Sequence, residues 1–346
     1  MSPRSRAYAK MAATAIQELL AKEHAAATAE FDAKIADRPW PGLGTIIEPL
    51  HISSARTILE MNGTIEVRTV TSRGAHSVPI ATLSSPKSRT STAVSRATSR
   101  KGLLMSRYLG WAQGTASRPG VIGPATEKVV QESLLAAAPN GYRVEGPGDT
   151  FLDVEINGPL DNRAFYTPIV DGIPRAPIAV PIEVKGGRDW LMAGDYQPYQ
   201  LLDKAAQLKT AQPDVPIAPL FFCRRAHMTL FRMAKDLGFF IIPANRQFIS
   251  PSVDEEKIIE VRSELGFLDL EATATADDQL VRRLTKAFPK QAEITAVRWE
   301  RTACHSDLPT WFEQMRDSHD RGERAELFHE VRSAAKDAGL YVTRGW

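Results

Sequence analysis

The chain has little cysteine and no long apolar run, and each absence excludes a class of protein. Its 346 residues include two cysteines, Cys223 and Cys304. Two separated thiols form neither a zinc cluster nor a disulfide framework, so we expect reduced thiols in a cytoplasmic protein. No apolar run is long enough to span a membrane, and the charged, alanine-rich first 36 residues are unlike a signal peptide. Gly-rich phosphate loops of the Walker or Rossmann type are absent as well.

Acidic residues are missing from one long stretch. Between Val67 and Thr126 there is no Asp or Glu, although the formal net charge of the whole chain is only +2. Residues 84–102 are also rich in Ser and Thr, which favours a flexible basic arm. Such arms bind phosphate backbones through counterion release, so we predict contact with nucleic acid; a solvated linker without a partner is the alternative. The predicted contact residues are Arg56, Arg68, Arg73, Lys87, Arg89, Arg96, Arg100, Lys101 and Arg107.

A short helix followed by a hairpin precedes this stretch. Residues 52–63 favour a helix with Ser53 as its N-cap and Gly63 as its stop. Residues 64–68 and 77–80 favour two strands around a turn at Arg73. The pair resembles the end of a winged helix-turn-helix, which implies that Arg56 and Thr57 face a DNA groove. A structural helix and hairpin without DNA contact is the alternative.

The clearest chemical signal is the run Pro177–Lys185, which ends in Glu-x-Lys. A strand that buries its valines and isoleucine on one side turns Glu183 and Lys185 to the other side. A carboxylate there can hold a divalent metal, and an amine can assist an attacking water. The same tripeptide type also occurs at 32–34 and 255–257, but inside helical runs. The strand context therefore separates the match at 183–185 from chance.

The segments around this strand predict an α/β domain with a mixed sheet between helices. A helix that starts near Gly123 places Glu127 on its apolar side, where a carboxylate needs a metal or a cationic partner. The alternative is that Glu127 only favours the helix dipole. A turn at 146–148 and a strand at 149–156 follow, with Asp153 opposite the aliphatic side chains. After Lys185 the pattern continues as helix, strand, helix and strand.

The region from about Gly123 to Pro243 resembles the PD-(D/E)xK, or restriction-endonuclease-like, nuclease superfamily, whose core runs helix, three-stranded meander, helix, strand. The resemblance implies that Lys185, Glu183, Asp153 and Glu127 are catalytic, the last three as metal ligands. It places Gln200 on the following helix and implies Mg²⁺ as the cofactor, with Mn²⁺ able to substitute. No proline precedes Asp153, and the loop to Glu183 is long. The second carboxylate therefore has alternatives, which are Asp149, Asp161 and Asp171.

The sequence thus predicts a restriction-endonuclease-like core with an N-terminal helix-plus-hairpin module and a helical C-terminal region. The expected segments are an N-terminal helix (1–38), a winged-helix-like module (39–83), a basic linker with a short helix (84–118), the nuclease-like domain (119–249) and the C-terminal region (250–346). The expected function is Mg²⁺-dependent hydrolysis of phosphodiester bonds in DNA. A non-catalytic DNA-binding regulator on a nuclease-like scaffold is the alternative. We expect DNA as the partner, no membrane, and a homodimer through the N-terminal or C-terminal helices.

Overall fold

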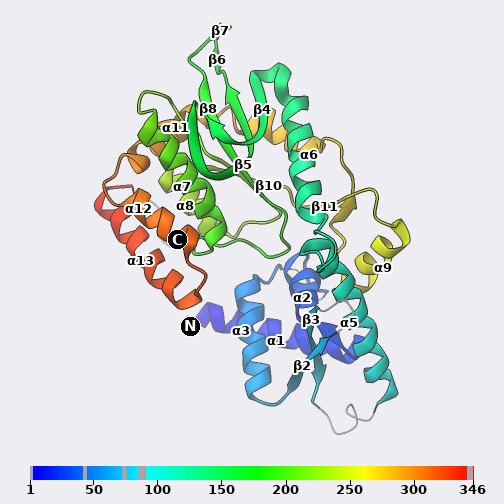
Figure 1. Ribbon diagram of the computed structural model, residues 1–346. Helices are drawn as coiled ribbons and strands as arrows, with labels where there is room; N and C mark the ends of the chain where they lie inside the picture. The colour runs from blue at the N-terminus through cyan, green and yellow to red at the C-terminus, as the bar shows by residue number, and fades with distance from the viewer. Residues whose placement is uncertain (1–2, 42–44, 72–75, 85–90, 341–345) are drawn as a thin grey trace. The chain divides into compact units, whose positions relative to one another are not determined.

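The computed structural model describes residues 3–41, 45–71, 76–84, 91–340 and 346 (Figure 1). The chain forms two compact units. Unit 1 contains Met1–Val121 and Ile249–Ala272, and unit 2 contains Ile122–Phe248 and Thr273–Trp346. Residues 250–346 are therefore not the separate C-terminal region that we expected, because they divide between the two units. None of the helices in the described ranges is both long and apolar enough to cross a membrane.

Unit 1 packs helices around a small antiparallel sheet with the strand order β1-β3-β2. Its elements are α1 (Pro3–Glu23), β1 (Ala26–Ala27), α2 (Thr28–Phe31), the π-helix η1 (Asp32–Ala36), α3 (Pro49–Met61), β2 (Ile65–Thr71), β3 (Ser77–Leu83), α5 (Thr92–Ala112), α9 (Glu255–Leu265) and β12 (Leu270–Ala272). Helix α1 buries Ala12, Ile16 and Leu20 at helical spacing, so its apolar face belongs to the core of this unit.

The helix and hairpin predicted near residues 52–80 are present, with one shifted boundary. Helix α3 begins at Pro49 with Glu48 in the N-cap position, so the prediction that Ser53 caps the helix is wrong. Proline fits the first helical turn, where its missing N–H has no partner to lose. The predicted stop at Gly63 is confirmed: its φ of 66° is a left-handed conformation that glycine adopts without strain.

Helix α5 replaces most of the predicted flexible arm. The Ser/Thr-rich composition of residues 84–102 favoured disorder, yet α5 begins at Thr92, and the Ser91 side chain accepts a hydrogen bond from the Val94 N–H. The helix is stabilised further along, because Leu104, Met105 and Tyr108 are buried in unit 1. Packing of these apolar residues outweighs the weak helix preference of the polar first turns.

Unit 2 is built on a five-stranded mixed sheet with the order β10-β9-β8-β5-β4. Strands β4, β5 and β8 form an antiparallel meander, and β8, β9 and β10 run parallel. The predicted α/β class with a mixed sheet between helices is confirmed.

The elements of unit 2 are α6 (Ile122–Ala137), the 3₁₀ helix η2 (Ala138–Asn140), β4 (Tyr142–Phe151), β5 (Val154–Tyr166), β6 (Ile169–Val170), β7 (Ile173–Pro174), β8 (Ile178–Lys185), α7 (Tyr196–Ala211), β9 (Leu220–Cys223), α8 (Met228–Leu237), β10 (Phe240–Pro243), α10 (Asp278–Arg282), the π-helix η3 (Arg283–Ala287), α11 (Ala292–Ala303), α12 (Leu308–Asp317) and α13 (Arg321–Asp337). Strand β11 (Gln247–Ile249) spans the point in the sequence where the two units divide.

Helices cover both faces of this sheet, and the alternation along the strands explains why (Figure 1). Val180, Ile182 and Val184 of β8 share one core with residues of α6. Phe221 of β9 belongs to the opposite core with residues of α7 and α8, whereas its neighbour Phe222 belongs to the α6 side. Because successive side chains point to opposite faces, Glu183 is turned away from the α6 core and toward α7.

The first hairpin of the meander turns later in the sequence than we predicted. Strand β4 continues through residues 146–148 as a bulged region, and the turn lies at Leu152 and Asp153, whose φ angles are 57° and 59°. Arg163 stabilises the bulge, because its guanidinium donates hydrogen bonds to the carbonyls of Gly146 and Pro147. Residues 157–161, which the sequence favoured as a loop, therefore lie within β5.

Candidate active site

Asp161, Glu183 and Lys185 meet where the ladder between β5 and β8 ends. The last paired residues are Asn162 and Ile182, so Asp161 is the next residue on β5. Its Oδ2 accepts a hydrogen bond of 2.6 Å from the Val184 N–H. Since Val184 separates Glu183 from Lys185, this bond fixes the Asp161 carboxylate beside the Glu-x-Lys sequence. The structure thus brings together one of the alternative carboxylates and the predicted Glu/Lys pair.

Asp153 is not part of this group. The expectation that it lies in a strand opposite aliphatic side chains is wrong, because it is an exposed residue of the β4–β5 turn. The adjacent Leu152 carbonyl accepts a hydrogen bond from Gln212, just beyond the end of α7. Glu183 instead contacts Lys204 of α7. Lys204 lies eight residues before Gln212, which corresponds to about 12 Å along a helix.

The other two alternative carboxylates also lie at exposed positions. Asp149 is exposed on β4, and its Oδ1 lies 3.4 Å from the Thr150 hydroxyl. Asp171 is exposed in the turn between β6 and β7, with a φ of 51°. Of the acidic residues considered from the sequence between Asp149 and Asp171, Asp161 is the one that the structure holds against β8.

Glu183 is buried and carries a lysine on each carboxylate oxygen. Its Oε1 accepts a hydrogen bond of 2.7 Å from Lys185 Nζ, and its Oε2 accepts one of 3.0 Å from Lys204 Nζ. The Glu183 side chain is 4% exposed, and those of Lys185 and Lys204 are 24% and 8% exposed. Two ammonium groups offset the cost of burying this carboxylate.

Lys204 was not predicted as a site residue, although the sequence contains a signal for it. It lies on α7 between Leu201, Ala205 and Leu208, all of which are buried. A lysine on an apolar helix face needs a buried partner, and the sequence alone did not show that the partner is Glu183. Gln200, which the resemblance placed near the site, lies one helical turn before Lys204 and is half-buried.

The electrostatic environment distinguishes Asp161 from an ordinary surface carboxylate. The pKa of Asp161 is raised to about 6, first by burial and then by the negative charge of Glu183. Lys185 and the Val184 N–H lower the pKa, and Glu127 of α6 adds a smaller rise. Glu127 is half-buried on α6 and contributes to the field at Asp161, as a residue near the site should. Strongly perturbed carboxyl groups of this kind cluster at functional sites.

The donor chemistry of the site suits a small divalent cation. The described ranges contain no group of three or more His, Cys, Asp or Glu arranged to hold a metal. Mg²⁺, however, retains several waters and is commonly bound through one or two carboxylates. Asp161 and Glu183 supply such a pair, and a positive charge beside Asp161 would favour its ionised form over the neutral form that burial favours.

Three of the predicted nucleic-acid contacts are ion-paired inside unit 1. Arg100 Nη2 lies 2.6 Å from Glu264 Oε1, and Arg107 pairs with Glu260. Lys101 is buried, with its Nζ 2.6 Å from Glu30 Oε2. These charges hold α5 against the acidic residues of its own unit, and a contact of the three residues with nucleic acid stays a prediction.

The remaining predicted basic residues are more exposed or are not described. Arg56 pairs with Glu60 one turn along α3, at 3.2 Å. Arg68 pairs with Glu66 at 2.8 Å and is exposed on β2, and Arg96 is exposed on α5. The further predicted contacts, Arg73, Lys87 and Arg89, lie outside the described residues. Arg68 and Arg96 are therefore exposed in the described part of unit 1, and the side chains of Arg56 and Arg100 are 37% and 39% exposed.

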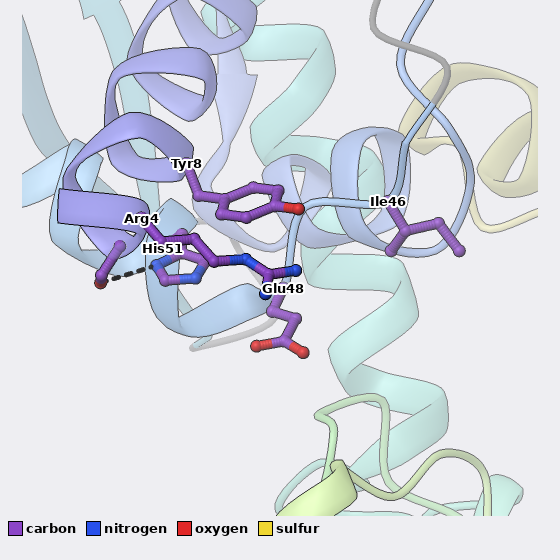
Figure 2. A pocket seen from close by; sticks show the side chains of 6 residues that line it. Arg4, Tyr8, Ile46, Glu48 and His51 are labelled. Atoms are coloured by element: carbon purple, nitrogen blue, oxygen red, sulfur yellow. Dashed lines mark hydrogen bonds between the residues drawn. The ribbon is translucent and has the colours of Figure 1, made fainter. Parts of the chain in front are cut away.

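A separate hollow of about 270 Å³ lies between α1 and α3 in unit 1 (Figure 2). The rings of Tyr8 and His51 stack there, with centroids 5.3 Å apart and planes 9° apart. The Arg4 guanidinium lies 5.8 Å from the centre of the Tyr8 ring, and the Ser5 hydroxyl lies 3.5 Å from His51 Nδ1. These contacts fasten α1 to α3, and none of the residues that line the hollow was predicted to be functional.

Comparisons of the chain with protein-family models, with curated proteins and with solved structures found no match. The chemistry of unit 2 must therefore be inferred from its own geometry. That geometry is a buried and a half-buried carboxylate from neighbouring strands, with one lysine from a strand and one from a helix.

Proposed function

We propose that the protein is a metal-dependent nuclease whose active site is the Asp161, Glu183 and Lys185 group of unit 2. The observation that carries the proposal is the Asp161 carboxylate, which is held against the Val184 N–H between Glu183 and Lys185. The order of α6, the β4–β5–β8 meander, α7 and the parallel strand β9 supports a restriction-endonuclease-like core. Phosphodiester bonds are the substrate class that this combination of carboxylates and amine serves.

Each residue of the group has a role in the proposed reaction. A divalent cation, held by Asp161 and Glu183, would supply a nucleophilic water at neutral pH and offset charge on the phosphate. Lys185 is partly exposed, and its ammonium lies close enough to the carboxylates to orient the attacking water and stabilise developing negative charge. Lys204 holds the buried Glu183 carboxylate in place. Glu127 adds negative charge on the α6 side.

Unit 1 is the proposed DNA-binding module. Strand β1 pairs with β3, so the helix α3 and the β2–β3 hairpin belong to a three-stranded sheet that α1 covers. This arrangement supports the winged-helix-like interpretation, in which α3 enters a DNA groove. Ser53 and Thr57 are exposed on α3, and Arg56 is half-buried beside them. DNA, rather than RNA, is the substrate that such a module favours.

One observation favours the second candidate, a non-catalytic DNA-binding regulator. Both carboxylate oxygens of Glu183 already accept hydrogen bonds from lysines. A buried carboxylate with two ammonium partners has its charge compensated by the protein and needs no metal ion. Under this alternative, the protein binds DNA but does not cleave it under any ionic condition.

A cleavage assay with matched variants distinguishes the candidates. Supercoiled plasmid, linear DNA and RNA are each incubated with purified protein in Mg²⁺, Mn²⁺ or EDTA. We expect cleavage with either cation and none in EDTA. Lys185→Ala and Asp161→Asn should each reduce the rate by about two to three orders of magnitude. Asp153→Asn is the control, because it changes an exposed turn residue that was the preferred ligand from the sequence.

The results separate three interpretations. Equal activity of the wild type and the Asp161→Asn variant would contradict the proposed site. Loss of activity in Asp153→Asn, with activity kept in Asp161→Asn, would restore the ligand set inferred from the sequence. Salt-sensitive DNA binding without cleavage by the wild type would establish the regulator instead.

A further inference from the structure

The two lysines that contact Glu183 are held in different ways. Lys204 Nζ donates to Glu183 Oε2 at 3.0 Å and to the Pro159 carbonyl at 2.5 Å, and its side chain is buried. Lys185 Nζ donates to Glu183 Oε1 at 2.7 Å, and its side chain is 24% exposed. Lys204 is therefore fixed between strands β8 and β5, whereas Lys185 can leave Glu183 at little cost in desolvation.

We propose that Lys204 is a specificity-determining residue for the cation: it occupies Glu183 Oε2 permanently and leaves only Oε1 to bind a metal. This inference rests on the proposed cation site. A cation at Oε1 would take the place of Lys185, whose side chain is 24% exposed and would then be available to the attacking water, while Lys204 would stay at Oε2. Lys204 acts through Glu183 and is thus a positioning residue.

The consequence is a preference between ions of equal charge. Ca²⁺ takes six to eight oxygens at flexible angles and readily uses both oxygens of a carboxylate, whereas Mg²⁺ requires near-octahedral geometry. Mn²⁺ accepts the same oxygen donors as Mg²⁺. A carboxylate limited to one oxygen suits Mg²⁺ and Mn²⁺ and removes a ligand that Ca²⁺ would use. Lys204 therefore disfavours Ca²⁺.

The binding of each ion can be measured without cleavage, by calorimetric titration of the full chain with Mn²⁺ and with Ca²⁺. We expect Lys204→Met to raise the affinity for Ca²⁺ relative to Mn²⁺ by about tenfold, since Glu183 can then use both oxygens. The ratio cancels the general electrostatic effect of removing a positive charge, because both ions are divalent. A merely structural role of Lys204 would weaken both ions and leave the ratio unchanged.

Lys209→Met is the matched control. Lys209 also lies on α7, is buried, and donates to the Pro213 carbonyl at 2.6 Å and the Val215 carbonyl at 3.2 Å, away from Glu183. Its loss should leave the ratio of affinities unchanged. Asp161→Asn should weaken both ions, which assigns the measured binding to this site.

Amine labelling of the wild-type protein tests the same inference without a variant that must fold. With acetic anhydride and mass spectrometry, Mn²⁺ should increase the modification of Lys185 and leave Lys204 protected. An unchanged affinity ratio in Lys204→Met, or exposure of Lys204 on Mn²⁺ binding, would overturn the role of Lys204. If the wild type binds neither ion, the cation site itself is absent and the proposed function fails with it.

Discussion

Asp161→Asn should make unit 2 more stable, although it removes the proposed activity. The pKa of Asp161 is raised from 3.8 to about 6 in the folded protein, mainly by burial and then by Glu183. Ionisation of this carboxyl therefore costs the folded state free energy. A shift of about two units corresponds to about 3 kcal/mol, at 1.36 kcal/mol for each unit. Asparagine keeps an acceptor for the Val184 N–H and carries no charge.

The expected stabilisation depends on pH with a definite sign. Because the pKa of Asp161 is raised in the folded protein, its protonated carboxyl group contributes stability to the folded state. This contribution is fully present below the unfolded-state pKa of 3.8 and is lost as the pH rises through about 6. In the wild type, the free-energy cost of ionising Asp161 in the folded state is therefore complete at pH 8, about half as large at about pH 5, and almost absent near pH 3. We expect the variant to be more stable by up to about 3 kcal/mol at pH 8, and by about 1.5 kcal/mol at pH 5.

Thermal or urea unfolding of both proteins across this pH range measures the difference. For a unit of this size, each 1 kcal/mol shifts the midpoint of thermal unfolding by about 2–4 °C. Asp153→Asn is the control, because Asn tolerates the left-handed turn conformation and an exposed change should stay within about 0.5 kcal/mol. A difference between Asp161→Asn and the wild type that is constant with pH, or that grows toward acid, would refute the electrostatic reasoning.

Two further predictions concern the packing of each unit. Lys101→Met should destabilise unit 1 by about 3 kcal/mol, because it leaves the buried Glu30 with one cationic partner fewer. The control Arg96→Met, on the exposed side of the same helix, should change the stability little. Equal melting temperatures of the two variants would contradict this prediction. Gly238→Ala should cost more than about 2 kcal/mol, since a Cβ there would lie 2.3 Å from backbone of α11. Gly172→Ala has a similar positive φ but open space around it, so urea unfolding should show a cost of only about 1 kcal/mol, and an equal cost at both glycines would be the contrary result.

Much of the frame of unit 2 could be predicted from local patterns. The apolar alternation in 178–185 correctly gave a strand with Glu183 and Lys185 opposite Val180, Ile182 and Val184, because a strand turns successive side chains to opposite faces. The order of helices and strands also followed from periodicity. The same reasoning placed the first hairpin turn wrongly, because residues 146–148 form a bulge in which Arg163 donates hydrogen bonds to the carbonyls of Gly146 and Pro147.

The identity of the second carboxylate was decided by tertiary structure. The local sequence favoured Asp153, because residues 149–156 alternate as in a strand and residues 157–161 favoured a loop. Only the register of β5 against β8 shows that Asp161 accepts the hydrogen bond from the Val184 N–H. Tertiary structure also decided which partners the basic residues of α5 have. The acid-free stretch looked like a free basic surface, yet α5 directs Arg100 and Lys101 to acidic residues that are distant in the chain.

The sequence by itself determined the strand that carries Glu183 and Lys185, the α/β class and the helix that follows, because these depend on periodicity over a few residues. Only the folded chain decided which distant side chains complete the site. Asp161 and Lys204 reach Glu183 because β5 pairs with β8 and α7 packs on the same sheet face. Such pairing depends on long-range register and on the burial of apolar faces, and no local pattern in the sequence encodes it.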